Sequence, residues 1–231
     1  MYESLSAAAR TFLNNVQIGI GTMARRADHS RDELERMVVD ATRAIVEDAG
    51  ISGVTARAIA KRIGYSPGTL YNLFANVDEI VMALNEQTLT AMGVHVMAAV
   101  QGLSDPLQRV RAMGAAYVRF AQQNRAVWLA VFEHRRRPGA AVAESYLARV
   151  GGLLGIVERE LAPLIGPTDA ATLAASARAL WAGVHGISVL DATDRSDLIG
   201  GLGATEMADL LIVNFVRGAQ AGAWPPQDRP A

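Results

Sequence analysis

Residues 54–74 read Val-Thr-Ala-Arg-Ala-Ile-Ala-Lys-Arg-Ile-Gly-Tyr-Ser-Pro-Gly-Thr-Leu-Tyr-Asn-Leu-Phe. Two short helices are expected here, because Thr55 and Ser66 are good N-cap residues and Pro67 is tolerated at the first position of a helix. Gly64 separates the two helices, since glycine readily takes the left-handed conformation that ends a helix. Such a pair is typical of a helix-turn-helix, whose second helix enters the major groove of DNA.

The expected second helix begins with small residues, which let a backbone approach a duplex closely. They are Ser66, Pro67, Gly68 and Thr69. Residues 51–77 hold three basic residues, Arg57, Lys61 and Arg62, and no acidic one, in a chain of net charge −1. The start of the first helix, at Thr55, offers unpaired backbone amides to a phosphate. A glycine between two short helices would by itself equally suit ordinary packing.

The sequence resembles the TetR family of bacterial transcriptional regulators over roughly residues 31–80. The residues that carry the resemblance are Thr55, Ile59-Ala60, Gly64, Gly68-Thr69-Leu70-Tyr71 and Phe74. The resemblance implies an all-α protein, in which a three-helix DNA-binding domain precedes a larger helical bundle that dimerises. It also implies repression of transcription as the usual action.

The resemblance further implies roles for single residues. Thr55 and Tyr71 would hold phosphates, and Thr69 would contact the DNA backbone or the groove. The residues that would face base edges, beside Ser66 at the helix tip, are Arg57, Pro67, Gly68 and Asn72. The three-helix core would contain Ile59, Ala60, Ile63, Leu70 and Phe74. Val77 stands where the family usually has a phosphate-binding lysine, so the salt dependence of DNA binding should fall by about one unit of slope.

Helix signals continue through the rest of the chain, and strand signals are nearly absent. Ser30 and Glu33 form a capping box for a helix that closes at Gly50. Asp78 is expected to cap a long helix that reaches about Val100. Later helices are expected at roughly residues 105–122, 125–135, 140–162, 168–190 and 205–221, with breaks at 137–139, 163–167 and 191–203.

These signals divide the chain into four segments. We expect an extension at residues 1–29, the DNA-binding domain at 30–78, a ligand-binding and dimerisation domain at 79–223, and a tail at 224–231. Met23 is a second plausible start. The hydrophobic fraction of 51% and the charged fraction of 19% suit folded domains. The near-neutral charge excludes a polybasic binder held by bulk charge alone.

The sequence predicts a cytoplasmic protein that contacts no membrane. The apolar residues near the N-terminus are interrupted by Asn14, Asn15 and Gln17, unlike a signal peptide. No other run approaches the roughly 20 apolar residues of a membrane span. The absence of cysteine excludes disulfides, cysteine catalysis and thiolate metal sites. We expect no cofactor and no metal, because a pair of His95 with His185 would lack a third ligand.

Aromatic and methionine side chains are spread over several helices expected after residue 91. Each suits core packing, but together they are typical of a bundle that leaves a cavity for apolar ligands. The expected ligand contacts are Met92, Met113, Tyr117, Trp128, Trp181 and His185. Two interpretations of His185 are open, a polar anchor for a ligand and a hydrogen-bonded core histidine. Residues 181–186 also resemble the Trp-His-Gly (WHG) signature of one subgroup of TetR-family C-terminal domains, with Trp181 and His185 on one helical face.

The last expected helix is apolar around most of its circumference, which indicates burial on more than one side. A second protomer would cover it, and small residues in the preceding helix would permit close contact. Gly183 is one of these small residues, and Gly183 and Gly186 would both allow a close approach by a neighbouring helix. The expected interface residues are Ala175, Ala179, Leu210, Leu211 and Phe215. A twofold dimer suits a pseudo-palindromic operator whose half-sites lie about 34–36 Å, or a multiple, apart.

The sequence therefore predicts a homodimeric repressor that a small apolar ligand releases from its operator. The helix that joins the two domains would change the separation of the two DNA-reading heads. Two alternatives stay open. An all-helical enzyme could pair His185 with Asp191 or Glu206, although no catalytic motif supports this. A DNA-binding protein without a ligand would have a filled bundle core.

Overall fold

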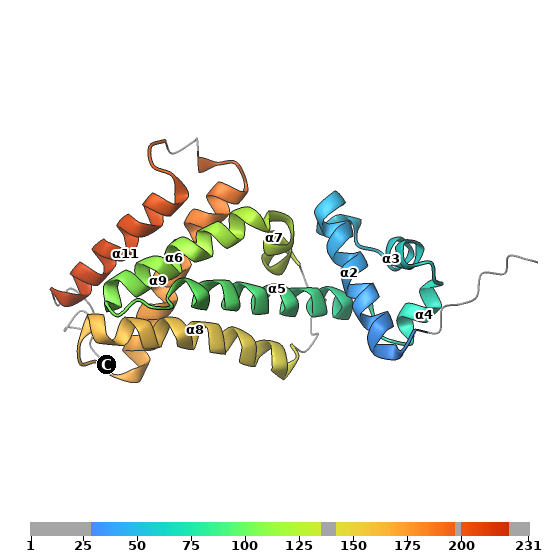
Figure 1. The fold of residues 1–231 in the computed structure, drawn as a ribbon, viewed down its shortest axis with the longest axis horizontal. Coiled ribbons are helices and arrows are strands. Elements are labelled where there is room, and N and C mark those ends of the chain that lie inside the picture. Colours follow the sequence, from blue (N-terminus) through green and yellow to red (C-terminus); the bar gives the residue numbers. More distant parts are fainter. Residues whose placement is uncertain (1–28, 135–141, 197–199, 222–231) are drawn as a thin grey trace, which may run out of the picture. The chain divides into compact units, whose positions relative to one another are not determined.

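The computed structural model describes residues 29–134, 142–196 and 200–221, and every regular element in them is helical (Figure 1). The elements are α2 (Arg31–Ala49), the 3₁₀ helix η1 (Ile51–Gly53), α3 (Ala56–Ile63), α4 (Pro67–Tyr71), α5 (Val77–Ala99), α6 (Pro106–Gln123), α7 (Arg125–Glu133), α8 (Glu144–Ile165), α9 (Ala170–Ala192) and α11 (Ala204–Gln220). The predicted all-α class is confirmed. The chain divides into two compact units, residues 1–34 and 35–231.

In the first unit, the described residues contain the capping box that the sequence predicts. The backbone N–H of Ser30 donates to Glu33 Oε2 at 2.7 Å, and the N–H of Glu33 donates to Ser30 Oγ at 3.2 Å. Most of the expected extension, the break at residues 137–139 and the tail lie outside the described residues.

In the second unit, α2, α3 and α4 close around a small apolar core. Val38, Ala41 and Ile45 of α2 meet residues of α3 and α4 there, and Ile80 of α5 completes the cluster. The residues from the helix-turn-helix are Ile59, Ala60 and Leu70, which are buried, and Ile63 and Phe74, which pack against them. The spacing of the apolar residues thus puts one face of each short helix inside.

The start of α5 differs from the sequence prediction. Asn76, not Asp78, is the N-cap: its backbone is extended, and its Oδ1 accepts a hydrogen bond from the N–H of Glu79 at 3.0 Å. Glu79 Oε2 in turn accepts from the N–H of Ala75 at 2.8 Å. Asp78 already lies in the first turn of α5, where a carboxylate interacts favourably with the helix dipole.

Two later boundaries also differ. The break expected at residues 163–167 starts only at Gly166, whose φ is 77°, since α8 continues through Pro163 to Ile165. The φ that proline fixes is compatible with a helix, so Pro163 can lie near the end of α8 at the cost of a lost hydrogen bond. The helix α9 continues to Ala192, into the loop expected at residues 191–203. Residues 197–199 of that loop lie outside the described residues.

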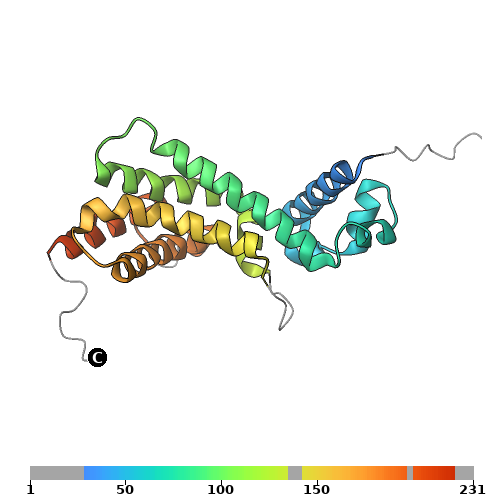
Figure 2. The same cartoon turned by 90° about the horizontal axis from the view of Figure 1, so that it is seen from below.

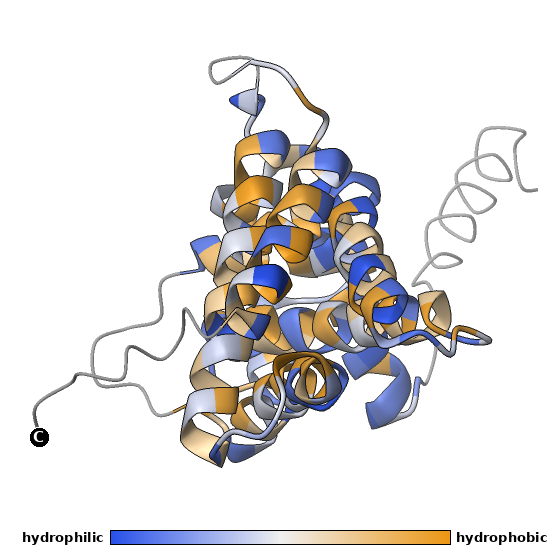
Figure 3. Ribbon diagram, turned by 90° about the vertical axis from the view of Figure 1, so that its left-hand side faces the viewer, coloured by the Kyte–Doolittle hydropathy of each residue, from blue (hydrophilic) through white to orange (hydrophobic). Residues whose placement is uncertain are grey.

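The helices α5 to α9 and α11 form a bundle with its own core. Its buried members include Val118 and Phe120 of α6, Leu180 of α9 and Ile212 of α11. In Figure 3, apolar and polar positions alternate along the helices, as expected when each helix buries one face. Figures 1 and 2 show α5 as one continuous helix beside α6 and α8. This helix contributes to three apolar clusters, through Ile80, Leu84 and Leu89.

The helix α9 has the length and the mean hydropathy, 1.2, that a membrane span could also have, which the sequence interpretation missed. It packs against α6, α8 and α11, and its residues Ala177, Leu180 and Val184 are buried. Its composition is therefore that of a bundle helix. Gly183 allows a close approach, as expected, because an added Cβ would lie 2.6 Å from Leu211 Cδ2. Gly186 does not have this role, since nothing lies within 4 Å of its added Cβ.

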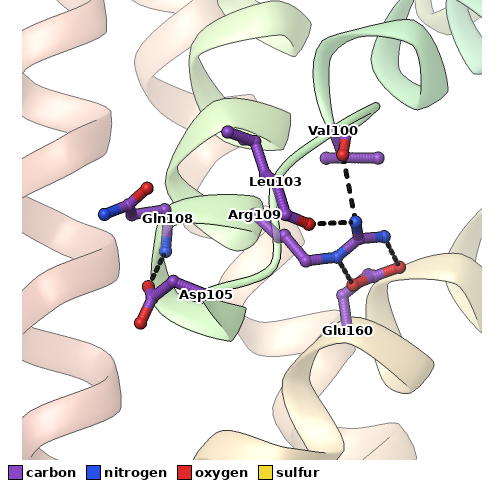
Figure 4. A network of polar contacts seen from close by, with 6 residues as sticks. All are labelled: Val100, Leu103, Asp105, Gln108, Arg109 and Glu160. Carbon is purple, nitrogen blue, oxygen red and sulfur yellow. Dashed lines mark hydrogen bonds and ion pairs between the residues drawn. The ribbon is translucent and has the colours of Figure 1, made fainter.

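One ion pair ties α6 and α8 to the loop after α5 (Figure 4). Arg109 donates from Nε and Nη2 to the two carboxylate oxygens of Glu160, at 2.6 and 2.7 Å. Its Nη1 donates to the carbonyl oxygens of Val100 and Leu103, at 3.0 and 2.9 Å. The two hydrogen bonds that Arg109 donates to the Glu160 carboxylate hold the pKa of Glu160 below its usual value. A bidentate pair of this kind fixes the relative position of its helices.

Candidate DNA-binding surface and ligand cavity

The helix-turn-helix forms where the sequence predicts it, and local hydrogen bonds explain why. Thr55 Oγ1 accepts from the N–H of Ala58 at 3.1 Å at the start of α3. Gly64 takes φ 76° and ends α3 in the left-handed region. Ser66 Oγ accepts from the N–H of Thr69 at 3.4 Å at the start of α4. Each bond satisfies a backbone group that a helix end leaves unpaired.

The predicted DNA contacts lie on the outside of this motif. Seven of the eight side chains are exposed, and Thr69 is half-buried. The exposed seven are Thr55, Arg57, Ser66, Pro67, Gly68, Tyr71 and Asn72. Tyr71 is 52% exposed although it follows the fully buried Leu70, which anchors α4 to the core. The motif therefore presents a short helix with a small-residue tip and an exposed phenol at its other end.

The fold changes the local charge. Arg62 of α3 donates to Asp48 of α2 at 2.7 Å. The sequence prediction of three excess positive charges considered residues 51–77 alone. Asp48 lies outside that range, but the fold places its carboxylate beside Arg62 of α3. Arg57 and Lys61 are exposed on the same helix. The basic character of the motif is therefore weaker than the sequence suggested, and sequence-independent attraction to phosphates should be modest.

Gly68 has space around it. A Cβ added there would meet only Ser66 Oγ within 4 Å, at 3.6 Å, which is an ordinary contact. The fold of the described residues therefore gives no packing reason for glycine at this position. The glycine is instead explained if another molecule approaches the α4 backbone closely, because a side chain at this position would then be in the way.

The bundle contains a partly open apolar cavity of about 190 Å³. Of the six predicted ligand contacts, Met92, Met113, Tyr117 and Trp181 line it. Trp128 and His185 do not line it but contact the rings of Tyr117 and Phe132, which do. A smaller space of about 60 Å³ shares Met113, Tyr117 and Trp181 with it. No lining residue of either space carries a charged side chain.

Sequence reasoning missed the contribution of α8 to this cavity. The lining residues from α8 are Tyr146, Val150, Leu153, Leu154, Ile156 and Val157. These residues recur at spacings of three and four, so the helical period was an available signal. They lack the methionine and aromatic character that guided the prediction, with Tyr146 as the exception. Phe132 of α7 was also missed as a lining residue.

His185 lies among aromatic rings. Its ring stacks on Trp181, with centroids 5.1 Å apart and planes 15° apart, and lies 4.2 Å from the ring of Phe132. Its Nδ1 is 3.0 Å from the Tyr117 hydroxyl oxygen. Burial lowers the pKa of His185 and raises that of Tyr117, so both side chains are neutral at pH 7. The hydrogen bond and the shared face with Trp181 agree with the interpretation of a bonded core histidine.

His95 does not join His185; its ring contacts Phe120, with centroids 5.8 Å apart. Within residues 29–134, 142–196 and 200–221, no three His, Cys, Asp or Glu side chains lie together as a metal would require.

The predicted dimer residues fall into two groups. Ala175, Ala179 and Leu210 are exposed. Leu211 and Phe215 are half-buried and pack against the bundle core of their own protomer. The face that a second protomer could cover therefore includes the first group.

A capped pair of short helices with an exposed second helix, together with a helical bundle around an apolar cavity, defines a helix-turn-helix regulator with a small-molecule site. Residues 38–84 match the bacterial regulatory proteins of the tetR family, and residues 110–215 match the tetracyclin repressor-like C-terminal domain. The chain belongs to the TetR family. It is a DNA-binding transcriptional regulator under ligand control, and not an enzyme.

Similar proteins agree with this assignment. The HTH-type transcriptional regulator BetI of Rhizobium meliloti (strain 1021) is 26% identical over 155 residues, which are 65% of this chain and 75% of BetI. A solved structure from Rhodococcus sp. RHA1 is 24% identical with a TM-score of 0.69, covering 84% of this chain and 98% of that one. FadR from Bacillus subtilis in complex with stearoyl-CoA is 12% identical with a TM-score of 0.63, covering 79% and 98%. The two structures show the shared fold.

Proposed function

We propose that the protein is a repressor that binds a pseudo-palindromic operator in double-stranded DNA as a homodimer and leaves it when a small apolar ligand binds. The observation that carries this proposal is the exposed tip of α4, formed by Ser66, Pro67 and Gly68. A tip of small residues suits contact with base edges at the floor of a groove. Repression is the usual action implied by the family resemblance.

The proposed contacts follow from chemistry and exposure. Arg57, Pro67, Gly68 and Asn72 would face base edges. Thr55 and Tyr71 would bind phosphates, and Thr69 would contact the DNA backbone or the groove. Thr55 accepts a hydrogen bond at its oxygen from Ala58, so its hydroxyl hydrogen can still be donated to a phosphate.

The cavity supports the ligand part of the proposal. Its wall is almost entirely carbon, so it favours an apolar molecule, and a filled core would have favoured a regulator without a ligand. FadR from Bacillus subtilis, which shares this fold, was solved in complex with stearoyl-CoA. The proposed ligand contacts remain Met92, Met113, Tyr117 and Trp181, with Trp128 and His185 behind them.

Two helices join the cavity to the helix-turn-helix. The helix α5 lines the cavity through Met92 and reaches the three-helix core through Ile80. The helix α7 lines it through Phe132 and packs through Val127 against Val39 of α2. A ligand that shifts either helix would change the placement of α2. Coupling of about 1–3 kcal/mol would weaken operator binding 5–150-fold.

Three finer assignments complete the proposal. A cytoplasmic location follows from the need to reach operator DNA. Assignment to the Trp-His-Gly subgroup is supported by the stacked pair of Trp181 and His185. The dimer would use Ala175, Ala179 and Leu210, with Leu211 and Phe215 supporting that face from inside.

Selection of bound DNA from a random pool tests the proposal first, because a dimer should select a palindrome. Operator affinity is then measured for Arg57→Ala and Tyr71→Ala at several salt concentrations. We expect Arg57→Ala to lose about 5–150-fold and to relax the preference at one base pair. Tyr71→Ala should weaken binding evenly across sequences.

Arg119→Ala is the matched control, since it removes an exposed arginine of α6 outside the motif. Its operator affinity should equal that of the parent. If both motif variants bind as tightly as the parent at every salt concentration, the DNA-binding assignment is wrong.

A further inference from the structure

We propose that the regulating ligand is an uncharged, mainly apolar molecule with one hydrogen-bond-accepting oxygen, as in an aryl ketone, and that the indole N–H of Trp128 binds this oxygen beside the Tyr117 hydroxyl. The proposal rests on the proposed function, because it takes the bundle cavity as the ligand site. It adds the chemical class of the ligand and the group that recognises it.

The wall of the cavity selects against charge. None of its lining residues is acidic or basic, and the nearby Tyr117 and His185 side chains are neutral at pH 7 for the reasons given above. A charged ligand would lose its hydration without gaining a partner of opposite charge, which costs several kcal/mol. The ligand is therefore neutral.

One buried donor beside the cavity, Trp128, has no acceptor at hydrogen-bond distance. The residue is 1% exposed, and its Nε1 has no such partner among the residues that the structure describes, although the indole lies near enough to the Tyr117 hydroxyl to oppose the rise in the pKa of that group. The indole N–H can only donate, so its complement is an acceptor. Tyr117 lies edge-on to Trp128, with ring centroids 6.1 Å apart, and its hydroxyl group is engaged with His185. An oxygen brought by a ligand would satisfy the indole without adding a charge.

Phe132 separates this donor from the cavity. It lines the cavity, and its ring centroid lies 5.2 Å from that of Trp128. Phe132 is 41% exposed, so its ring can turn outward into solvent, with the loss of its contacts with the rings of Trp128 and His185. A ligand that displaces Phe132 would bring its oxygen to Trp128 while its apolar part stays in the cavity.

The volume limits the size of the apolar part. The cavity of about 190 Å³ is somewhat larger than an apolar cavity of about 150 Å³ that holds benzene. One six-membered ring with a short substituent therefore fits without movement of the helices. Acetophenone meets both requirements, and ethylbenzene has nearly the same shape without the oxygen.

The test compares acetophenone, ethylbenzene and benzoate as probes of the full-length protein. Binding is measured by thermal shift and by tryptophan fluorescence. We expect acetophenone to bind about tenfold more tightly than ethylbenzene, the value of one added hydrogen bond, and benzoate to bind most weakly. Equal binding of acetophenone and ethylbenzene, tighter binding of benzoate, or no binding of any probe would overturn the proposal.

Trp128→Phe keeps an aromatic ring and removes the donor. It should bind ethylbenzene as the parent does and lose the tenfold preference for acetophenone. If Trp128→Phe fails to fold, the indole N–H resonances of the parent serve instead, because acetophenone, and not ethylbenzene, should shift that of Trp128 downfield. Tyr146→Phe removes a hydroxyl group from the wall and should keep the preference. A preference that survives in Trp128→Phe, or a Trp128 indole resonance that acetophenone leaves unshifted, would contradict the assignment of the donor.

Operator binding in the presence of the probes separates this proposal from the proposed function. If acetophenone binds as expected and operator affinity does not change, the recognition of the ligand oxygen by Trp128 is right, and the regulatory role of the cavity is wrong. If acetophenone and ethylbenzene release the operator equally well, the regulatory role is right and the recognition is wrong.

Discussion

Among single residues, Gly68 allows DNA binding to be separated from stability. Gly68→Ala should fold at least as well as the parent, because the added Cβ meets only Ser66 Oγ at 3.6 Å and alanine favours a helix. Operator binding should weaken about tenfold or more, since the methyl group would hold the α4 backbone away from base edges. Thermal unfolding and fluorescence anisotropy with labelled operator measure the two effects. Unchanged operator affinity would mean that the tip of α4 does not approach the bases.

The contribution of Glu160 to the free energy of unfolding should change with pH in a defined direction. Its pKa is lower in the folded state than the ordinary value of 4.5, because Arg109 donates hydrogen bonds to the carboxylate. Its contribution to stability is therefore complete above pH 4.5 and is lost as the pH falls through the folded-state pKa. Glu160→Gln should be less stable at pH 7 by about 1–3 kcal/mol, since Arg109 then keeps an incomplete set of partners.

Denaturant unfolding of the parent and of Glu160→Gln at several pH values checks this. Other carboxylates titrate equally in both proteins, so the difference between the two free energies of unfolding isolates Glu160. That difference should shrink as the pH falls below 4.5. A difference that stays constant down to the acid limit would show that the ion pair does not lower the pKa of Glu160.

Among the helices, α8 and α9 respond oppositely to the same substitution. A Cβ added at Gly152 or Gly155 of α8 would meet nothing within 4 Å, whereas one at Gly183 of α9 would lie 2.6 Å from Leu211 Cδ2. Gly152→Ala and Gly155→Ala should each raise stability by about 0.5–1 kcal/mol, because alanine loses less backbone entropy in a helix. Gly183→Ala should lower stability by about 1–3 kcal/mol, because the added methyl group forces the half-buried Leu211 side chain out of its present rotamer.

Thermal melts of the three alanine variants, each compared with the parent, measure these effects. A lower melting temperature for Gly152→Ala would indicate a contact of α8 in the dimer. A higher one for Gly183→Ala would show that the packing of α9 on α11 is looser than the structure indicates.

At the scale of the whole molecule, the expected dimer depends on the outer faces of α9 and α11. Leu210 is 51% exposed, and it belongs with Ala175 and Ala179 to the predicted interface. Leu210→Asp should yield monomers, because a buried unpaired carboxylate is costly. Operator affinity should fall at least tenfold, since the two half-sites would no longer be bound together.

Light scattering gives the oligomeric state, and anisotropy gives the operator affinity. Leu147→Asp is the control, because Leu147 is an equally exposed leucine on α8, outside the expected interface. A dimer that persists in Leu210→Asp would move the interface to another face of the bundle.

The sequence by itself determined the features that depend on neighbours along the chain. The caps at Thr55 and Ser66 and the turn at Gly64 involve residues within four positions of one another, so residue type and spacing were enough to predict them. The apolar residues of the two short helices were predicted for the same reason. Asp78 was chosen wrongly as a cap because Asn76, two residues earlier, competes for the same role, and the backbone conformation decides between them.

Only the tertiary structure decided which distant residues meet. It paired Arg62 with Asp48 and so reduced the basic charge of the motif. It joined Tyr117 to His185 across 68 residues, and it placed Phe132 at the cavity with Trp128 behind it. Helical periodicity tells which residues share a face, but the angle and rotation at which helices pack decide what that face touches. These contacts are therefore properties of the assembled bundle, whereas the DNA-reading motif can be predicted from its own short sequence.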